Sequence, residues 1–159
     1  MVSLAELKEI EIFQDYTEEM LQKIQPLVES CLFGKDEMIF AEEVQADKIY
    51  MISQGKIVLE KKLSSTVTIS MGAIKAGHCI GFSAIEVGAP FSMAARAVEK
   101  STLFCIKGRH LLELFKKETR MGYYFMRRIN GVMRDRIARL EERLFRSLKE
   151  HPDFKTVLN

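Results

Sequence analysis

The residues best suited to bind a ligand lie between Gly77 and Ile106, in the segment GHCIGFSAIEVGAPFSMAARAVEKSTLFCI. We expect a short helix near residues 82–86, and the backbone N–H groups at the start of a helix attract anions without help from a side chain. Ser83 and Ser92 can each donate a hydroxyl hydrogen bond in the same region. These residue types favour the binding of a small anionic or polar group rather than a chemical reaction.

Catalytic and metal-binding patterns are missing from the sequence. It contains no Gly-x-Ser-x-Gly, no His-Glu-x-x-His and no Walker-type glycine loop, so we expect a protein that is not an enzyme. No two of the histidines His78, His110 and His151 have the i, i+4 spacing of metal ligands. His78 and Cys79 are adjacent and would point apart on a strand. We therefore predict no metal site.

Length and composition indicate one globular domain. The chain has 159 residues, of which 47% are hydrophobic and 29% charged, which excludes a disordered class. No apolar run approaches the roughly 20 residues that span a bilayer, and the acidic, amphipathic start is not a signal peptide. Cys31, Cys79 and Cys105 form no paired pattern. We expect free thiols and a cytoplasmic protein without a membrane partner.

The hydrophobic period changes twice along the chain. The first forty residues have helical spacing, with Asp15 or Thr17 as the cap of a helix. Short apolar or β-branched segments separated by glycines follow, which predicts a sandwich or barrel. These segments are residues 38–41, 48–53, 56–62, 66–72, 92–98 and 102–107. Gln54-Gly55 is typical of a two-residue hairpin turn.

The helical period returns after Gly108 and continues almost to the end. Apolar residues then step by three and four, as in a coiled coil of about three heptads. The stripe consists of Met126, Ile129, Met133, Ile137, Leu140, Leu144 and Leu148. We predict a β-domain with N-terminal helices over residues 1–118, a dimerisation helix over 119–150 and a tail over 151–159. The alternative is that the stripe packs on its own domain.

Charge is distributed unevenly. Residues 1–106 carry 10 basic and 15 acidic residues, whereas residues 107–159 carry 14 basic and 7 acidic residues. A basic helix can touch nucleic acid without sequence preference or bind an acidic protein partner. A solvated, arginine-rich helix face is the simpler interpretation.

The order of helices, short strands and a long helix, together with the glycine-rich segment, resembles the cyclic nucleotide-binding domain of the catabolite activator protein, FNR-like regulators and kinase regulatory subunits. The resemblance covers roughly Leu4 to Leu144. The matching positions in the segment are Gly77, Gly81, Ala84, Ile85, Gly88, Pro90, Ala97, Leu103 and Ile106. It implies a mainly β fold with flanking helices, namely a double-stranded β-helix (jelly-roll-like) barrel with a long C-terminal helix.

Three positions depart from the family pattern. Glu43 stands where a turn glycine is usual, so the turn must be rearranged or Glu43 must adopt an unfavourable φ. Phe82 replaces the glutamate that accepts the ribose 2′-hydroxyl, and Phe91 replaces the arginine that pairs with the cyclic phosphate. Loss of both anchors corresponds to about 3–6 kcal/mol, or a factor of roughly 10² to 10⁴ in affinity.

The resemblance implies a candidate ligand cassette whose residues are Gly81, Phe82, Ser83, Ala84, Phe91, Ser92 and Met93. Three occupants stay open at this point: an apolar or heterocyclic ligand such as haem, a standard cyclic nucleotide, or the two phenyl rings themselves. Arg96 is the nearest substitute cation. It lies five residues beyond Phe91, so on a regular strand it faces the opposite side of the sheet.

The sequence therefore favours a stand-alone sensory or regulatory homodimer with a degenerate phosphate-binding cassette. A ligand-free module that binds a protein partner is one alternative, and a fragment of a transcription regulator without its helix-turn-helix is another. The residues after the long helix are too few for such a module, so we expect no sequence-specific DNA binding by this chain alone.

Overall fold

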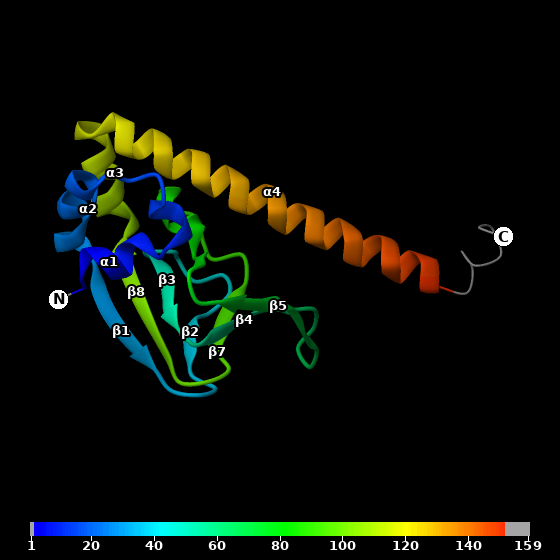
Figure 1. Cartoon of the computed structure of the whole chain (residues 1–159). Coiled ribbons are helices and arrows are strands. Elements are labelled where there is room, and N and C mark those ends of the chain that lie inside the picture. Colours follow the sequence, from blue (N-terminus) through cyan, green and yellow to red (C-terminus); the bar gives the residue numbers. More distant parts are fainter. Residues whose placement is uncertain (1, 152–159) are drawn as a thin grey trace. The chain divides into compact units, whose positions relative to one another are not determined.

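Two four-stranded antiparallel sheets form the centre of the fold, which the computed structural model describes for residues 2–151 (Figure 1). The first sheet has the order β1 (Glu29–Phe33), β8 (Ser101–Lys107), β3 (Lys48–Gln54) and β6 (Cys79–Ile80). The second has the order β2 (Met38–Phe40), β7 (Ala94–Ala97), β4 (Lys56–Lys62) and β5 (Thr68–Lys75). The predicted mainly β fold with flanking helices is confirmed.

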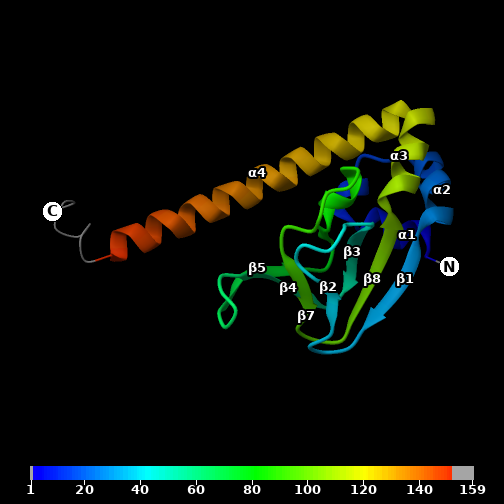
Figure 2. The ribbon, with the colours of Figure 1, turned by 180° about the vertical axis from the view of Figure 1, so that it is seen from behind.

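Helices precede and follow the strands. The N-terminal ones are α1 (Leu4–Lys8), η1 (Glu11–Phe13), α2 (Glu18–Ile24) and η2 (Gln25–Leu27). Thr17, one of the two predicted caps, accepts a hydrogen bond from the Met20 backbone N–H at 3.3 Å. After the strands come α3 (Gly108–Lys117) and the long α4 (Thr119–Glu150). Figure 2 shows α1, α2, α3 and the first turns of α4 at the same end of the sheets as the start of β1.

The predicted hairpin at Gln54-Gly55 is wrong. β3 and β4 flank this dipeptide, but β3 pairs with β8 and β6, whereas β4 pairs with β5 and β7. Gly55 is thus the corner at which the chain passes from one sheet to the other. Its φ of 95° is in the left-handed region, and Ser101 packs directly against its α-carbon. The turn residue was recognised correctly, but the partners of its strands depend on pairing far along the chain.

The core is apolar on both sides of the central strands. Ile49, Met51 and Ile52 of β3 are 0–1% exposed, as is Leu103 of β8. A second apolar layer joins the N-terminal helices to the start of α4, where the Phe125 ring lies 6.5 Å from the Phe13 ring and 5.0 Å from the Phe115 ring. The Tyr16 hydroxyl donates to the Met121 carbonyl at 2.9 Å in this layer. The N-terminal helices are therefore part of the domain's core.

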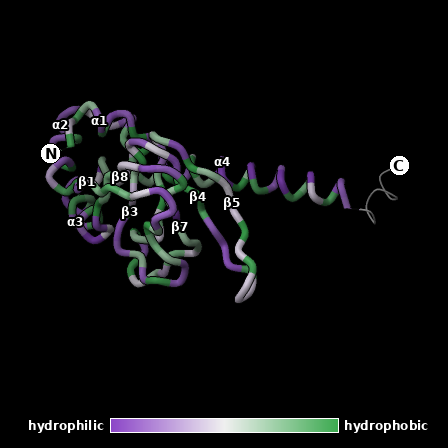
Figure 3. Tube along the Cα trace, turned by 90° about the horizontal axis from the view of Figure 1, so that it is seen from below, coloured by the Kyte–Doolittle hydropathy of each residue, from purple (hydrophilic) through white to green (hydrophobic). Residues whose placement is uncertain are grey.

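The chain divides into two compact units, Met1–Phe125 and Met126–Asn159. The described part of the second unit is the rest of α4, along which hydrophobic and hydrophilic residues alternate turn by turn (Figure 3). Of the predicted dimer residues, Met126, Ile137, Leu140 and Leu144 are 41–58% exposed, Met133 is half-buried and Ile129 is buried. The predicted tail lies outside the described residues from position 152 onward. Between residues 2 and 151, no helix combines the length and hydrophobicity that a membrane span requires.

We expect Gly55→Ala to lower the free energy of unfolding by about 2–4 kcal/mol, because the new Cβ would combine a left-handed φ with a contact of 2.8 Å to the Ser101 α-carbon. Gly88→Ala is the matched control. Gly88 has a φ of 81° but no atom within 4 Å of the added Cβ, so only the backbone term of about 1–2 kcal/mol applies. Urea unfolding of both variants measures the difference. Equal losses would contradict the close packing at the corner.

Candidate functional site

The predicted cassette helix is present as η3 (Phe82–Ile85), and Gly81 precedes it with a φ of 81°. A Cβ at Gly81 would lie 2.9 Å from the Lys48 carbonyl oxygen and 3.3–3.4 Å from the rings of Phe91 and Tyr50. Both the left-handed φ and the close approach require glycine. This residue therefore holds the start of η3 tightly against β3 and against Phe91.

The chain around Phe91 is fixed by a short ladder with the turn that follows β2. The Glu43 backbone N–H donates to the Phe91 carbonyl, and the Phe91 N–H donates to the Val44 carbonyl, both at 2.9 Å. The Ala46 N–H donates to the Ala89 carbonyl at 3.0 Å. Glu43 has a φ of 66°, which confirms that it takes the glycine-like conformation. The ladder sets the direction in which the Phe91 side chain points.

The Phe91 ring points inward and is 3% exposed. It stacks on Phe40 of β2, with 3.9 Å between ring centroids and 15° between ring planes. Phe40 in turn lies 5.5 Å from the ring of Tyr50 of β3, and burial raises the pKa of Tyr50 to about 12. We call Phe40, Tyr50 and Phe91 the aromatic cluster. It occupies the space directly beneath Gly81.

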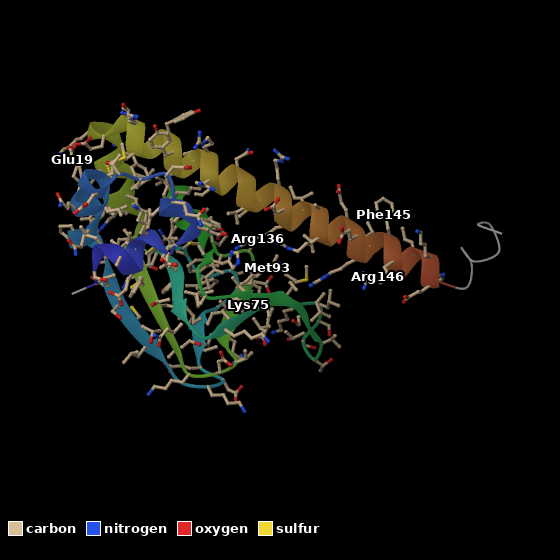
Figure 4. The ribbon with its side chains drawn as sticks, in the orientation of Figure 1. Glu19, Lys75, Met93, Arg136, Phe145 and Arg146 are labelled. Atoms are coloured by element: carbon tan, nitrogen blue, oxygen red, sulfur yellow. The ribbon has the colours of Figure 1, made fainter. Side chains whose placement is uncertain are left out.

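The other cassette candidates lie around this cluster with different exposures. On η3, Phe82 and Ser83 are half-buried and Ala84 is buried. Ser92 is exposed, and Met93 is half-buried just before β7 (Figure 4). Among the candidates, Gly81 and Phe91 pack closely against each other.

A cation that the sequence did not reveal lies beside Ser92. Lys61 of β4 donates from Nζ to the Ser92 carbonyl at 2.9 Å and pairs with the Glu42 carboxylate. Glu42 also accepts a hydrogen bond from the Lys62 backbone N–H at 3.1 Å. These hydrogen bonds lower the pKa of Glu42, and the one from Lys61 has the largest effect. Lys61 comes 31 residues before Ser92, and only the sheet brings the two together.

Arg96 is held away from the cassette. Its Nε lies 3.3 Å from Oε2 of Glu60, and one terminal nitrogen donates to the Asp36 carbonyl at 2.9 Å. Glu60 belongs to β4, and Arg96 pairs across the sheet with Val58 of the same strand. This environment agrees with the expectation that Arg96 faces away from Phe91.

A cavity of about 400 Å³ lies on another side of η3, between the turn after β2 and the start of α3. Its lining is mixed in polarity and consists of Gln45, Ala46, Asp47, Ala84, Glu86, Val87, Gly88, Lys107, Arg109 and Leu112. Ala84 is the one candidate cassette residue in this lining. None of the lining residues is a histidine, cysteine, methionine or tyrosine, which are the side chains that hold haem iron. Among the described residues, no cluster of three or more histidine, cysteine, aspartate or glutamate side chains could hold a metal ion.

The cassette helix and α3 are in direct contact. Gly108, the first residue of α3, is buried, and a Cβ there would lie 2.6 Å from the Ala84 carbonyl carbon. The Gly108 N–H also donates to the Asp47 carbonyl at 2.9 Å. A shift of η3 must therefore displace the start of α3, because backbone atoms meet without an intervening side chain.

Comparison with protein families and solved structures gives a consistent result. Residues 31–118 match the family model described as "Cyclic nucleotide-binding domain". The structure is similar to a putative cyclic nucleotide-binding protein from Geobacter metallireducens (TM-score 0.75, 23% identity, 86% of this chain and 99% of that one). It is also similar to a cyclic nucleotide-binding domain from Methylobacillus flagellatus (0.79, 17%, 94% and 84%).

The catabolite activator protein of Thermus thermophilus has a TM-score of 0.71 and 18% identity, over 88% of this chain and 64% of that one. At these identities the structural matches establish the fold. No curated protein matches the chain in sequence.

We expect Phe91→Ala to lower the free energy of unfolding by about 3–5 kcal/mol, because the change removes a buried ring and leaves a cavity next to Phe40. Val87→Ala is the control, since Val87 is 91% exposed and its truncation should change stability by less than about 0.5 kcal/mol. Chemical denaturation of both variants tests this. A loss below about 1 kcal/mol for Phe91→Ala would contradict a packed cluster.

Proposed function

The chain belongs to the cyclic nucleotide-binding domain family, and we propose that it is a regulatory member whose cassette no longer holds a cyclic nucleotide in the family's usual way. It is a non-catalytic module that acts as a homodimer through α4. The stack of Phe91 on Phe40 carries this proposal. Three further observations support the proposal: the cation beside Ser92, the contact between η3 and α3, and the exposed stripe of α4.

The stack affects nucleotide binding in two ways. Phenylalanine offers no hydrogen-bond donor to a phosphate, so the charge-assisted contact expected from an arginine at this position is lost. The ring is also 3% exposed and packed in the aromatic cluster, so it occupies volume rather than lining an open site. A bound phosphate would have to displace the ring and would gain no charge-assisted contact from this position in return. Loss of affinity by about 10² to 10⁴ follows from the two missing anchors together.

Lys61 does not restore the missing charge. Its ammonium group already pairs with Glu42 and donates to the Ser92 carbonyl. A phosphate at this place would meet the Glu42 carboxylate as well, whose pKa is held low, so it stays charged at neutral pH. The net charge of the pair is close to zero. This arrangement stabilises the turn between the cassette and β7 and gives an anion little attraction.

The contact of Ala84 with Gly108 supplies a route from the cassette to the helices. Because η3 and α3 touch through backbone atoms, two positions of η3 would require two positions of α3. An effector that bound one arrangement more tightly would shift the equilibrium by that difference, commonly 1–3 kcal/mol. In this protein the effector is a partner protein or a ligand other than a cyclic nucleotide.

The dimer is proposed from the apolar stripe on the described part of α4. Ile137, Leu140 and Leu144 are 41–58% exposed, and Phe145 and Leu148 continue the apolar surface at 60% and 36%. The stripe repeats with intervals of three, four and four, so Met126, Ile137 and Leu148 are eleven residues apart. An eleven-residue repeat keeps a partner helix in contact with a slight right-handed crossing rather than the left-handed coil of heptads. A second copy of α4 has the matching apolar face.

For nucleotide binding, we expect the melting temperature of the wild-type protein to stay unchanged in millimolar cAMP or cGMP, because binding to the native state is too weak to stabilise it. The double variant Phe82→Glu/Phe91→Arg supplies both missing anchors and should gain a ligand-dependent rise in melting temperature. Differential scanning fluorimetry and calorimetry measure both.

The matched control is Phe82→Gln/Phe91→Met, which opens the cluster without adding charge and should gain no nucleotide response. Micromolar cAMP binding by the wild-type protein would overturn the proposal. A response of the control variant equal to that of the charged variant would show that space, rather than charge, limits binding.

For oligomeric state, we expect a mass of twice the 18.3 kDa of one chain in light scattering, and a single-chain mass for Leu140→Glu/Leu144→Glu. Charged residues in a coiled-coil seam would be desolvated without partners, which opposes association. Ala138→Glu is the control, because Ala138 is exposed and lies on the opposite side of the helix from Leu140, and this variant should remain dimeric. A wild-type monomer at high concentration would exclude the dimer.

A further inference from the structure

Two cysteines on neighbouring strands bring their sulfur atoms close together. Sγ of Cys31 on β1 lies 2.8 Å from Sγ of Cys105 on β8. This separation exceeds the length of an S–S bond by less than about 1 Å. Cys31 is directly opposite Leu103, and Cys105 is directly opposite Glu29, so the two thiols are diagonal neighbours on the same face of the sheet. Neither cysteine has a role in the proposed function.

The two thiols differ in access to solvent. Cys31 is half-buried and Cys105 is 1% exposed. Among residues 2–151, β1 is an edge strand with β8 as its one neighbour in the sheet. The Glu29 carboxylate lies 3.9 Å from Sγ of Cys105 and pairs with the Lys48 ammonium at 3.2 Å. A small reagent therefore reaches Cys31 first. The charged pair of Glu29 and Lys48 lies beside Cys105.

We propose that Cys31 and Cys105 form a reversible disulfide when the protein meets a peroxide. In the first step Sγ of Cys31 attacks one peroxide oxygen and the O–O bond breaks. The products are a sulfenic acid on Cys31 and one water, which takes up the thiol proton. In the second step Sγ of Cys105 attacks the Cys31 sulfur and the S–O bond breaks. The departing hydroxide takes the Cys105 proton and leaves as a second water, so two thiols lose two electrons and one peroxide gains them.

The order of the steps follows from the surroundings of each thiol. Burial raises the pKa of Cys105 to about 12, so this cysteine is a poor first nucleophile toward peroxide. After Cys31 is oxidised, however, the Cys105 thiol already lies close to the electrophilic sulfur of Cys31. Cys105 then reacts because of this short distance and not because of a low pKa. Cys79 is fully buried on β6 and takes no part.

Bond formation requires a small movement of β1. Diagonal residues of an antiparallel pair are about 7–8 Å apart, whereas disulfide-linked α-carbons are usually about 4.4–6.8 Å apart. An edge strand can make this adjustment because it is hydrogen-bonded on one side alone. The resulting bond would tie β1 to the strand that leads directly into α3. Oxidation thereby acts on the element next to the cassette helix.

The test treats the 159-residue chain with hydrogen peroxide and counts its free thiols after denaturation. The count should fall from three to one per chain, with a mass lower by two hydrogen atoms, and non-reducing peptide mapping should join the peptides of Cys31 and Cys105. Dithiothreitol should restore all three thiols, since disulfides are reducible and the higher sulfur oxides are not. Cys79→Ser is the matched control and should form the same bond.

Cys31→Ser and Cys105→Ser should form no intramolecular bond, and Cys105→Ala replaces the latter variant if the serine disturbs the buried site. Three free thiols after treatment would overturn the proposal. So would sulfinic or sulfonic acid on Cys31 as the main product, or a bond between two chains in place of the bond within one. The bond within one chain joins two thiols of the same sheet, so its formation does not depend on whether the protein binds a nucleotide or dimerises.

Discussion

The packing of Phe91 against Phe40 is the interaction on which the character of this site depends. It is produced by several features together: the ladder between residues 43–46 and 89–91 directs the side chain, Gly81 leaves room for it, and Tyr50 packs against Phe40. The family's architecture survives around the stack, including the turn before η3 and the contact with α3. At the position of the candidate cassette, the scaffold therefore holds the Phe91 side chain within the apolar core.

The surrounding charges are consistent with such a closed site. Lys61 and Glu42 neutralise each other next to Ser92, and Arg96 is bound to Glu60 and the Asp36 carbonyl. A cyclic nucleotide pocket needs a cation whose hydrogen-bond donors are directed at the phosphate, because buried charge must be paired. Here the cations near the cassette are paired with the protein itself. The electrostatics of the region stabilise its own turns and strands.

Local pattern predicted the helices and most of the strands, and the fixed spacing of glycine and apolar residues was enough to predict the fold. The local pattern was wrong for residues 29–33, which lie within the first forty residues of helical spacing but form β1. The left-handed backbone of Glu43 could be expected as well, because a missing glycine in a required turn has few alternatives. The sheet change at Gly55 could not, since a glycine turn looks the same whether its strands pair with each other or with distant partners. Lys61 beside Ser92 and Cys31 beside Cys105 were missed for the same reason: strand register, not spacing along the chain, makes them neighbours.

The burial of Phe91 also limits which substitutions the sequence can accept at this position. An arginine at position 91 alone would place a guanidinium against the Phe40 ring with no phosphate to pair with it, and its loss of stability would come before any gain in binding. The Phe40 and Tyr50 rings would have to turn to make room for it, so the effect of a substitution at position 91 depends on these neighbours. Under the proposed function, such epistasis makes a return to nucleotide recognition hard to reach by single substitutions, and sequence change is accommodated more easily on the outer surfaces of the domain.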